Sequence, residues 1–321
     1  MPAVSHVETN GSAVDIDVVI CAYTLDRWEQ LVAAVRSVEA QRRPAERVIV
    51  VIDHNDDLLA RSRDEFATHT VLPNAHKQGL SGARNTGIAE ATAEVVAFLD
   101  DDATADPAWL SATADALADP GVGGVGGRVL PNWETGAPGW FPDEFLWVVG
   151  CSYRGLPEEQ AEIRNPIGAN MAFRRTLMTD VGGFREEVGR VGSIPVGCEE
   201  TELSIQVRRR GHRILYAPDA LVSHLVTADR TRWHYFWTRC LNEGRSKAAV
   251  ARLTGADEAL ESERAYATRT LPAGTLRRLR RAGTGPRRVD ALLGAAAIVI
   301  GLVVTGFGYV EGTIRRGRAI T

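Results

Sequence analysis

Val95-Val-Ala-Phe-Leu-Asp-Asp-Asp102 places three consecutive aspartates directly after a run of five apolar residues. The run predicts a buried strand with Asp100, Asp101 and Asp102 at its C-terminal end, where open α/β sheets bind ligands. We expect the three aspartates to be exposed there. Adjacent carboxylates repel one another unless a cation compensates them, and oxygen ligands suit Mg²⁺ or Mn²⁺ better than Zn²⁺. The stretch therefore indicates a divalent metal that holds a phosphorylated substrate. The alternative is a solvated acidic turn that caps the helix expected near Asp106-Pro107.

The residues before this strand alternate between predicted strands and helices. Asp15 to Thr24 is a β-branched run that ends in a polar turn, and Arg27 to Gln41 carries apolar residues at helical spacing. Arg47 to Asp53 predicts a second strand, and Thr70 to Leu72 predicts a weaker extended segment. This alternation favours an α/β fold with a mostly parallel sheet that helices cover on both faces.

A glycine-containing segment, Gly79-Leu-Ser-Gly-Ala-Arg-Asn85, precedes a helix expected over Ile88 to Thr92. We expect the segment to form a flexible loop whose small residues let the backbone approach a ligand. Arg84 would supply a fixed cation for phosphate, and Asn85 would both donate and accept hydrogen bonds. An ordinary loop with a structural arginine is the alternative.

The order of these motifs resembles the nucleotide-sugar half of a family 2 glycosyltransferase of the GT-A fold, a Rossmann-like α/β architecture. The motifs are Cys21-Ala-Tyr-Thr24, Val51-Ile-Asp53, Gly79 to Asn85 and Phe98-Leu-Asp-Asp-Asp102. Three later segments resemble the family's acceptor-side strand, its following turn and its catalytic acidic motif: Asn165 to Phe173, Val181-Gly-Gly-Phe184 and Gly197-Cys-Glu-Glu-Thr-Glu-Leu203. The resemblance covers roughly residues 14 to 245 and depends on the order of the motifs more than on any one of them.

The resemblance implies a nucleotide-sugar donor and a divalent metal. The implied donor-binding residues are Thr24, Asp53, Arg84, Asn85, Asp100 and Asp101, with Thr24 and Asp53 at the base and ribose. The implied ligands of Mn²⁺ or Mg²⁺ are Asp102, Asp100 and His224, and the ion would take up charge as the nucleotide leaves. A strand-terminal turn is the alternative for Asp53, and a structural histidine is the alternative for His224.

Glu199 and Glu200 precede an amphipathic run, Leu203 to Val207, so we expect them at a helix N-terminus, where carboxylates are stabilised without any function. Most relatives have Glu-Asp or Asp-Asp here, with the second acid as catalytic base, whereas this chain has glutamate at both positions. The resemblance implies Glu200 as the base of an inverting displacement, with Glu199 as the second candidate.

Composition agrees with an enzyme of this size. With 321 residues and 45% hydrophobic content, the chain can bury one large core, and its net charge of -4 gives no indication of nucleic-acid binding. The four cysteines are widely separated, which favours reduced thiols in a cytosolic domain. Residues 1–13 are polar and lack the apolar core of a signal peptide.

The C-terminal third changes character. Seven arginines occur between Arg269 and Arg288 without any Asp or Glu, and Ala291 to Val310 then runs uncharged for 20 residues, enough for about 30 Å of helix. We expect one transmembrane helix, with a buried core helix or a re-entrant hairpin as the alternative. The larger basic cluster lies on the catalytic side, which favours a cytoplasmic catalytic domain and offers cations for anionic lipid or a polyprenyl phosphate.

Aromatic residues are dense in Trp133 to Trp147 and again in Trp233-His-Tyr-Phe-Trp237. Such density usually marks a core, and the alternative is an acceptor groove or a belt at a membrane interface.

The sequence thus predicts a membrane-tethered, metal-dependent, inverting hexosyltransferase with a lipid-linked or envelope glycan acceptor. The expected organisation is a catalytic domain over 14–250, divided at 105/106 into nucleotide and acceptor halves, then a basic juxtamembrane segment (251–290), a single transmembrane helix (291–310) and a short basic tail (311–321). The alternatives are a sugar-nucleotide nucleotidyltransferase and a non-catalytic, membrane-anchored carbohydrate-binding protein.

Overall fold

The computed structural model describes residues 14–187, 197–255, 261–284 and 287–314. The polar start of the chain and the basic residues Arg315, Arg316 and Arg318 lie outside these ranges.

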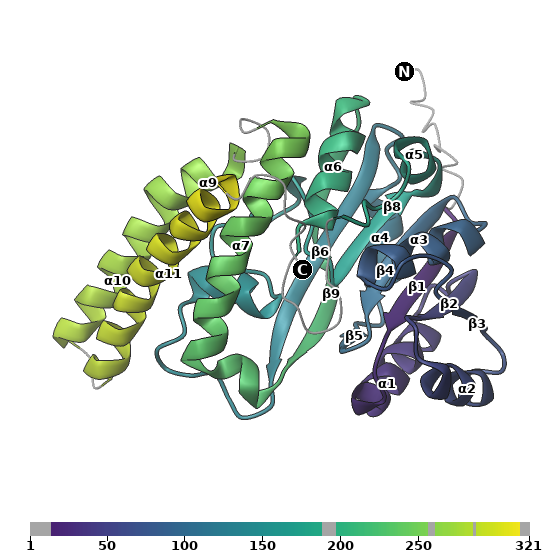
Figure 1. The fold of residues 1–321 in the computed structure, drawn as a ribbon, viewed down its shortest axis with the longest axis horizontal. Coiled ribbons are helices and arrows are strands. Elements are labelled where there is room, and N and C mark those ends of the chain that lie inside the picture. The colour runs from purple at the N-terminus through teal and green to yellow at the C-terminus, as the bar shows by residue number, and fades with distance from the viewer. Residues whose placement is uncertain (1–13, 188–196, 256–260, 285–286, 315–321) are drawn as a thin grey trace, which may run out of the picture.

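The first half of the sheet consists of parallel strands with helices between them (Figure 1). Its strands are β1 (Ile16–Ala22), β2 (Arg47–Ile52), β3 (Thr70–Pro73) and β4 (Val95–Asp100). The intervening helices are η1 (Leu25–Arg27), α1 (Trp28–Glu39), α2 (Asp56–Glu65) and α3 (Leu80–Glu90). The expected βα order is confirmed, and the carboxyl ends of β1, β2 and β4 meet at one edge.

The second half continues the same sheet in mixed directions, in the order β3-β2-β1-β4-β8-β6-β9-β5, with β7 paired to β9. Its strands are β5 (Ala103–Ala105), β6 (Val122–Trp133), β7 (Ala161–Glu162), β8 (Asn170–Arg174) and β9 (Arg213–Val226). Its helices are α4 (Trp109–Ala116), η2 (Asp143–Val149), α5 (Arg175–Val181), α6 (Glu199–Arg209) and η3 (Ala228–Thr231). The longest ladder here, between β6 and β9, is parallel.

A group of helices follows the sheet and lies along one side of the molecule (Figure 1). It comprises α7 (Trp233–Thr254), α9 (Glu261–Ala265), η4 (Tyr266–Thr270), α10 (Leu271–Thr284) and α11 (Arg288–Ile314). α11 packs against both α7 and α10.

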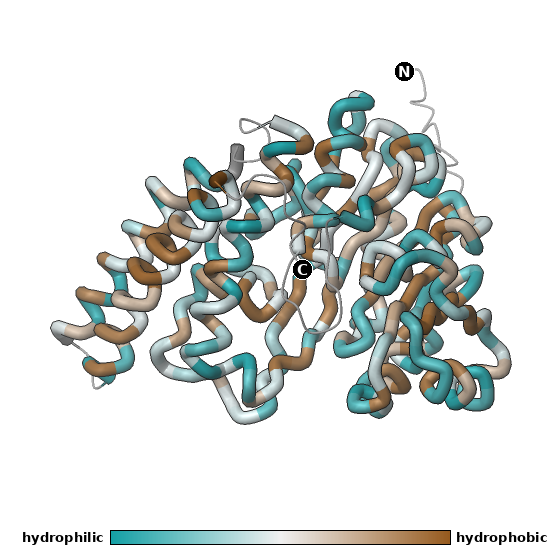
Figure 2. Tube along the Cα trace, viewed as in Figure 1, coloured by the Kyte–Doolittle hydropathy of each residue, from teal (hydrophilic) through white to brown (hydrophobic). Residues whose placement is uncertain are grey.

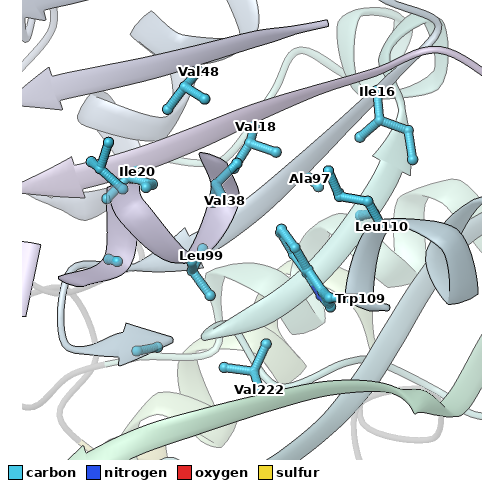
Figure 3. Packing of buried hydrophobic residues seen from close by; sticks show 14 of the residues in the cluster. Ile16, Val18, Ile20, Val38, Val48, Ala97, Leu99, Trp109, Leu110 and Val222 are labelled. Atoms are coloured by element: carbon cyan, nitrogen blue, oxygen red, sulfur yellow. The ribbon is translucent and has the colours of Figure 1, made fainter. Parts of the chain in front are cut away.

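Apolar side chains fill both faces of the sheet. On one face, Val18 and Ile20 of β1 pack with Leu99 of β4 and with Trp109, which has no exposed surface (Figure 3). The indole of Trp109 donates a hydrogen bond of 2.7 Å to Oδ1 of Asn170, so the buried ring keeps a partner for its polar atom. This core fixes the strand ends that carry the acidic residues.

The expected loop over Gly79 to Asn85 is wrong, because α3 begins at Leu80. Only Gly79, with φ of 136°, remains outside the helix, and it lets the chain turn sharply into α3. Gly87 then allows close packing of α3 on β1, since a Cβ at this position would overlap the side chain of Val19. Glycines that predict flexibility in the sequence therefore serve tight packing.

The aromatic segments form a third apolar cluster between the sheet and the C-terminal helices. Trp140, Phe141 and Phe145 pack on Phe236 of α7, with ring centroids 5.3 to 5.7 Å apart. Ile298 and Val304 of α11 belong to the same cluster. Most of the aromatic density is thus core.

One helix among the described residues, α11, is long and apolar enough to cross a membrane. Of its most apolar window, 44% is buried inside the protein. Figure 2 shows its hydrophobic residues beside those of the neighbouring helices.

Candidate active site

The aspartate triplet lies where β4 ends and the chain turns into β5. Asp101 and Asp102 are only 4% and 7% exposed, whereas the side chain of Asp100 keeps 27% of its surface. The expected exposure of the whole triplet is therefore wrong, because basic side chains from distant parts of the chain cover its second and third members.

Asp102 is the centre of a buried ion-pair network. Its Oδ1 lies 3.0 Å from Nε2 of His224, and its Oδ2 lies 3.0 Å from Arg230 and 3.4 Å from Arg27. Burial alone would raise the pKa of Asp102, but His224, Arg230 and Arg27 together hold that pKa far below its ordinary value. Burial likewise works against a charged imidazole, yet Asp102 raises the pKa of His224 to about 10.

Asp101 is compensated less completely. Its Oδ1 accepts a hydrogen bond of 2.8 Å from Arg27, and its buried Oδ2 has no hydrogen-bond partner among the described residues. Burial and the neighbouring charge of Asp102 raise the pKa of Asp101 to about 7. A carboxylate oxygen buried without a donor is a place where a bound cation would lower the energy.

Asp100, Asp102 and His224 could hold a divalent cation together. Each offers one ligand atom, and these atoms lie within 4.8 Å of one another. Two carboxylates and an imidazole suit Mn²⁺ and are acceptable to Mg²⁺. The donor set fits the expected metal, provided that His224 gives up its proton when the metal binds.

Arg84 connects the triplet to the acidic motif on α6. It is 2% exposed, and it donates to Oε1 of Glu199 at 2.8 Å, to Oδ1 of Asp100 at 3.4 Å and to the carbonyl of Gly168 at 3.0 Å. Burial disfavours its charge, but Glu199 and Asp100 raise the pKa of Arg84 above its ordinary value. The guanidinium is thus occupied by protein groups and holds the two acidic segments together.

The amide of Asn85 faces away from these acidic groups. It donates to the carbonyl of Phe184 and accepts from the amide of Phe184, each at 2.8 Å. Both functional atoms of the side chain therefore help to fix the turn after α5.

Glu199 and Glu200 open α6, as expected, after Cys198, which has a φ of 79°. Glu199 is 4% exposed and bonds to Arg84 through Oε1, while its Oε2 has no hydrogen-bond partner among the described residues. Glu200 is half-buried, and burial together with the adjacent charge of Glu199 raises its pKa to about 8. The two neighbours therefore differ in their hydrogen-bond partners.

Asp53 and Thr24 lie at the same edge of the sheet, after β2 and β1. Asp53 accepts hydrogen bonds from the side chain of Asn74 at 2.7 Å and from the amide of Gly79 at 2.9 Å, so it braces the turn into α3. Thr24 accepts from the amide of Asp26 at 3.2 Å and caps η1. Both residues have structural roles, and each oxygen keeps lone-pair capacity for a ligand.

A pocket of about 640 Å³ runs from these groups toward the C-terminal helices. Asp100, Arg84, Glu199, Glu200 and His224 line one end, together with Arg230. The other end is formed by aromatic and apolar side chains, which include Trp147, Tyr153, Tyr266, Leu302 and Tyr309. One cavity therefore joins a charged chamber to an apolar one.

A second ion network also lines this pocket. Lys247 of α7 is 3.1 Å from Glu243 and also contacts Glu263, and Arg164 binds Glu263 at 2.5 and 3.0 Å. Burial works against the charge of Lys247, but the two glutamates raise its pKa above the ordinary value.

Sequence reasoning missed the basic partners of the triplet, Arg27 and Arg230. Arg27 follows Thr24 in the first polar turn, and Arg230 lies six residues after His224 in a run of charged residues. Their position next to already identified strand ends is the only signal for them, since an arginine in a polar turn is otherwise an ordinary surface residue.

The chain is similar to known glycosyltransferases. The family model described as glycosyl transferase family 2 matches residues 17–182. A Haloferax volcanii protein described as a glucosyl-dolichyl phosphate glucuronosyltransferase is 33% identical over 306 residues, which are 93% of this chain and 96% of that protein. The succinoglycan biosynthesis protein ExoM of Rhizobium meliloti is 26% identical over 240 residues, 72% of this chain and 73% of that protein.

Two solved structures share the fold. The mannosyltransferase PcManGT of Pyrobaculum calidifontis, in complex with GDP-Man and Mn²⁺, matches 94% of this chain and 86% of its own with a TM-score of 0.57 and 18% identity. GalNAc-T7 with UDP, GalNAc and Mn²⁺ matches 77% of this chain and 54% of its own, with a TM-score of 0.52 and 16% identity.

Proposed function

The chain belongs to glycosyl transferase family 2 and has the GT-A fold, and we propose that it moves a sugar from a nucleotide-sugar donor to a lipid-linked or envelope glycan acceptor, with inversion at the anomeric carbon. The observation that carries the proposal is the single pocket that joins Asp100 and His224 to Glu199 and Glu200. Transfer needs a phosphate-binding group and a base within reach of the same sugar, and the residues that line this pocket include a candidate for each.

The donor nucleotide would bind in the half formed by residues 14–105, at the carboxyl ends of β1, β2 and β4. Ligands of open α/β sheets bind at this edge. Thr24 and Asp53 would contact the base and ribose, and Asp100 and Asp101 the ribose or sugar. For Arg84 we propose a positioning role in place of a direct phosphate contact, because Glu199, Asp100 and Gly168 already occupy its guanidinium.

Asp100, Asp102 and His224 would hold a divalent ion, Mn²⁺ or Mg²⁺. Such an ion, when bound, supplies Lewis-acid stabilisation of the charge on the leaving diphosphate. Arg230, which lines the pocket 3.0 Å from Asp102, adds a fixed positive charge at the same place. The donor's negative charge would thus be met by groups that the protein holds in position before binding.

Glu200 would act as the base. Its proton affinity near neutral pH suits a general base, whereas Glu199 is held by Arg84. The acceptor hydroxyl would pass its proton to Glu200 while its oxygen attacks the anomeric carbon. The bond from that carbon to the nucleoside diphosphate breaks on the opposite side, which inverts the configuration.

The acceptor would bind in the half formed by residues 106–250 and extend into the apolar end of the pocket. A lipid-linked acceptor fits this end, where side chains of α11 form the wall. We also propose that the C-terminal segment holds the enzyme at a membrane with the catalytic domain on the cytoplasmic side, as the arginine-rich residues before α11 favour.

Thermal unfolding of the purified full chain with a panel of nucleotide sugars, with and without Mn²⁺, tests the proposal. One nucleotide class should raise the melting temperature only when Mn²⁺ is present, since a ligand at 100 times its Kd adds about 2.7 kcal/mol. Stabilisation by a nucleoside triphosphate and by a sugar phosphate would instead indicate a nucleotidyltransferase, which joins these two substrates.

A further inference from the structure

The helix α11 has two different long faces. Small and aliphatic residues at spacings of three and four are buried: Ala291, Gly294, Ala295, Ile298, Gly301 and Gly308. Larger apolar residues on the opposite face are exposed: Leu292, Val299, Val303, Phe307 and Val310. Val303 and Phe307 are each 64% exposed, so this outer face has no partner within the described part of the chain.

The inner face contacts the catalytic domain along the whole length of the helix. A Cβ at Gly301 would overlap the ring of Phe145, and one at Gly308 would overlap the carbonyl of Leu241 on α7. Near the C-terminal end, Glu311 pairs with Arg245 at 2.6 Å, and Arg252 donates to the carbonyl of Gly312 at 2.8 Å. The helix is therefore part of the folded domain rather than a separate tether.

This packing is incompatible with an upright crossing of a bilayer. If α11 crossed, α7 would lie at the same depth, with the ion network around Glu243 and Lys247 and the charged pocket beside it. Ionised groups at that depth are strongly disfavoured. A helix with one face on a folded domain and an apolar face outward is instead typical of proteins that lie in the plane of the membrane interface.

Basic residues flank the apolar face. Leu276 and Leu279 of α10 are exposed, and Arg281, Arg287 and Arg288 are exposed nearby in the chain. The segment from Arg269 to Val289 contains no acidic residue. Arginines beside exposed leucines complement the headgroups and acyl chains of an anionic leaflet.

We propose that α10 and α11 seat the protein on an anionic membrane leaflet, with α11 lying in the plane of the interface and without crossing the bilayer. Leu302, one turn after the buried Ile298 on the inner side of α11, is 41% exposed and lines the pocket together with Thr305, Gly306 and Tyr309, next to the outer face of the helix. The apolar end of the pocket therefore opens beside the membrane face. A lipid-linked molecule reaches Glu200 from the leaflet without entering water.

Chemical labelling of cysteines placed at the two ends of α11 distinguishes a helix that lies in the membrane interface from one that crosses the bilayer. Arg287→Cys and Thr313→Cys flank the helix, at exposed positions about 39 Å apart along its axis. With a membrane-impermeant maleimide, both should react in inverted vesicles and neither in intact cells, and peptide mass distinguishes them from the native Cys21. Reaction of either position in intact cells, or failure of either to react in inverted vesicles, overturns the proposal.

Flotation of the purified full chain with vesicles tests whether the protein binds an anionic lipid surface. The chain should float with vesicles containing phosphatidylglycerol and much less with phosphatidylcholine alone. Val303→Asp combined with Phe307→Asp should abolish flotation, and Arg281→Gln should lower the partition coefficient about fivefold. Leu25→Asp, an exposed apolar residue on the nucleotide half, is the matched control and should float as the wild type does.

A chain that binds neither kind of vesicle would overturn the proposal. A dimer that dissociates in the Val303→Asp, Phe307→Asp variant would also overturn it, because the outer face of α11 would then contact a second copy of the chain. Neither readout uses catalytic activity, so either failure leaves the proposed transferase reaction untouched.

Discussion

Glu199 and Glu200 are neighbours in the chain, but the fold gives them different surroundings. Arg84 neutralises Glu199 from 115 positions away, whereas Glu200 is half-buried and accepts a hydrogen bond of 3.4 Å from the hydroxyl of Thr201. Both residues lie in the first turn of α6, where successive positions are about 100° apart around the helix axis. The difference in partners is the residue-scale basis for assigning proton transfer to Glu200.

The elevated proton affinity of Glu200 predicts a pH dependence. Below its pKa of about 8 the carboxyl is protonated and cannot accept a proton, so kcat/KM for the acceptor should rise about tenfold per pH unit up to that value and then level off. Initial rates between pH 6 and 9 measure this limb. The residual rate of Glu200→Gln should lack it, and a flat profile in the wild type would contradict the role.

Asp100 and Asp102 should respond differently to substitution. Asp100→Asn should weaken Mn²⁺-dependent binding of nucleoside diphosphate more than about 100-fold, because loss of outer partners alone costs metal sites 10–100-fold. Its stability should stay within about 1 kcal/mol of the wild type, since the side chain is partly exposed and its contact with Arg84 is long.

Asp102→Asn should in addition destabilise the fold by about 3–5 kcal/mol, because it leaves His224 and Arg230 without their buried counter-charge. Calorimetric titration together with urea unfolding measures both effects. Equal stability of the two variants would show that the ion network contributes little.

At the scale of elements, the fit between α7 and α11 depends on glycines. Gly308→Ala places a methyl group on the carbonyl of Leu241 and should lower the free energy of unfolding by about 1–3 kcal/mol. Gly306→Ala, two positions away on the same helix, meets nothing within 4 Å and should raise it by up to about 1 kcal/mol through helix propensity. Urea unfolding in mild detergent compares them, and similar values would contradict the close packing.

The sequence predicts the elements well where each carries its own periodicity. The run before Asp100 and the amphipathic turn after Glu200 both form the expected strand and helix. The segment containing Arg84 is different, because its glycines suggest a loop while its helix is stabilised by packing against β1. Pairings such as Arg84 with Glu199, or Arg230 with Asp102, depend on how strands are ordered in space, which no local pattern encodes.

At the scale of the whole molecule, the sequence predicts a transmembrane helix over 291–310 that follows the catalytic domain. Its length and apolar composition are the same for a span and for a helix that packs on a domain, so sequence alone could not distinguish them. The small residues on its inner face allow α7 to pack closely against the helix. Their role can be recognised only when the structure shows this contact.

Truncation after Arg281 should therefore destabilise the protein. It removes the buried side chains of Ile298 and Val304 from the cluster around Phe236, which is worth about 3–6 kcal/mol. Thermal unfolding should show a lower melting temperature or aggregation. A soluble, equally stable product of this truncation would mean that α11 is dispensable for the fold.

The central claim is that one pocket binds the donor through its acidic edge and deprotonates the acceptor through Glu200. This claim is tested most directly by measuring the transfer of a radiolabelled sugar into the chloroform-soluble fraction of a membrane lipid extract. The donor in this assay is the nucleotide sugar that stabilises the protein most. Glu200→Gln should lower this transfer by about 10²–10⁴-fold while its donor Kd stays that of the wild type, and Glu187→Gln, an exposed glutamate outside the pocket, should transfer normally. Wild-type transfer by Glu200→Gln with an unchanged donor Kd would contradict the account.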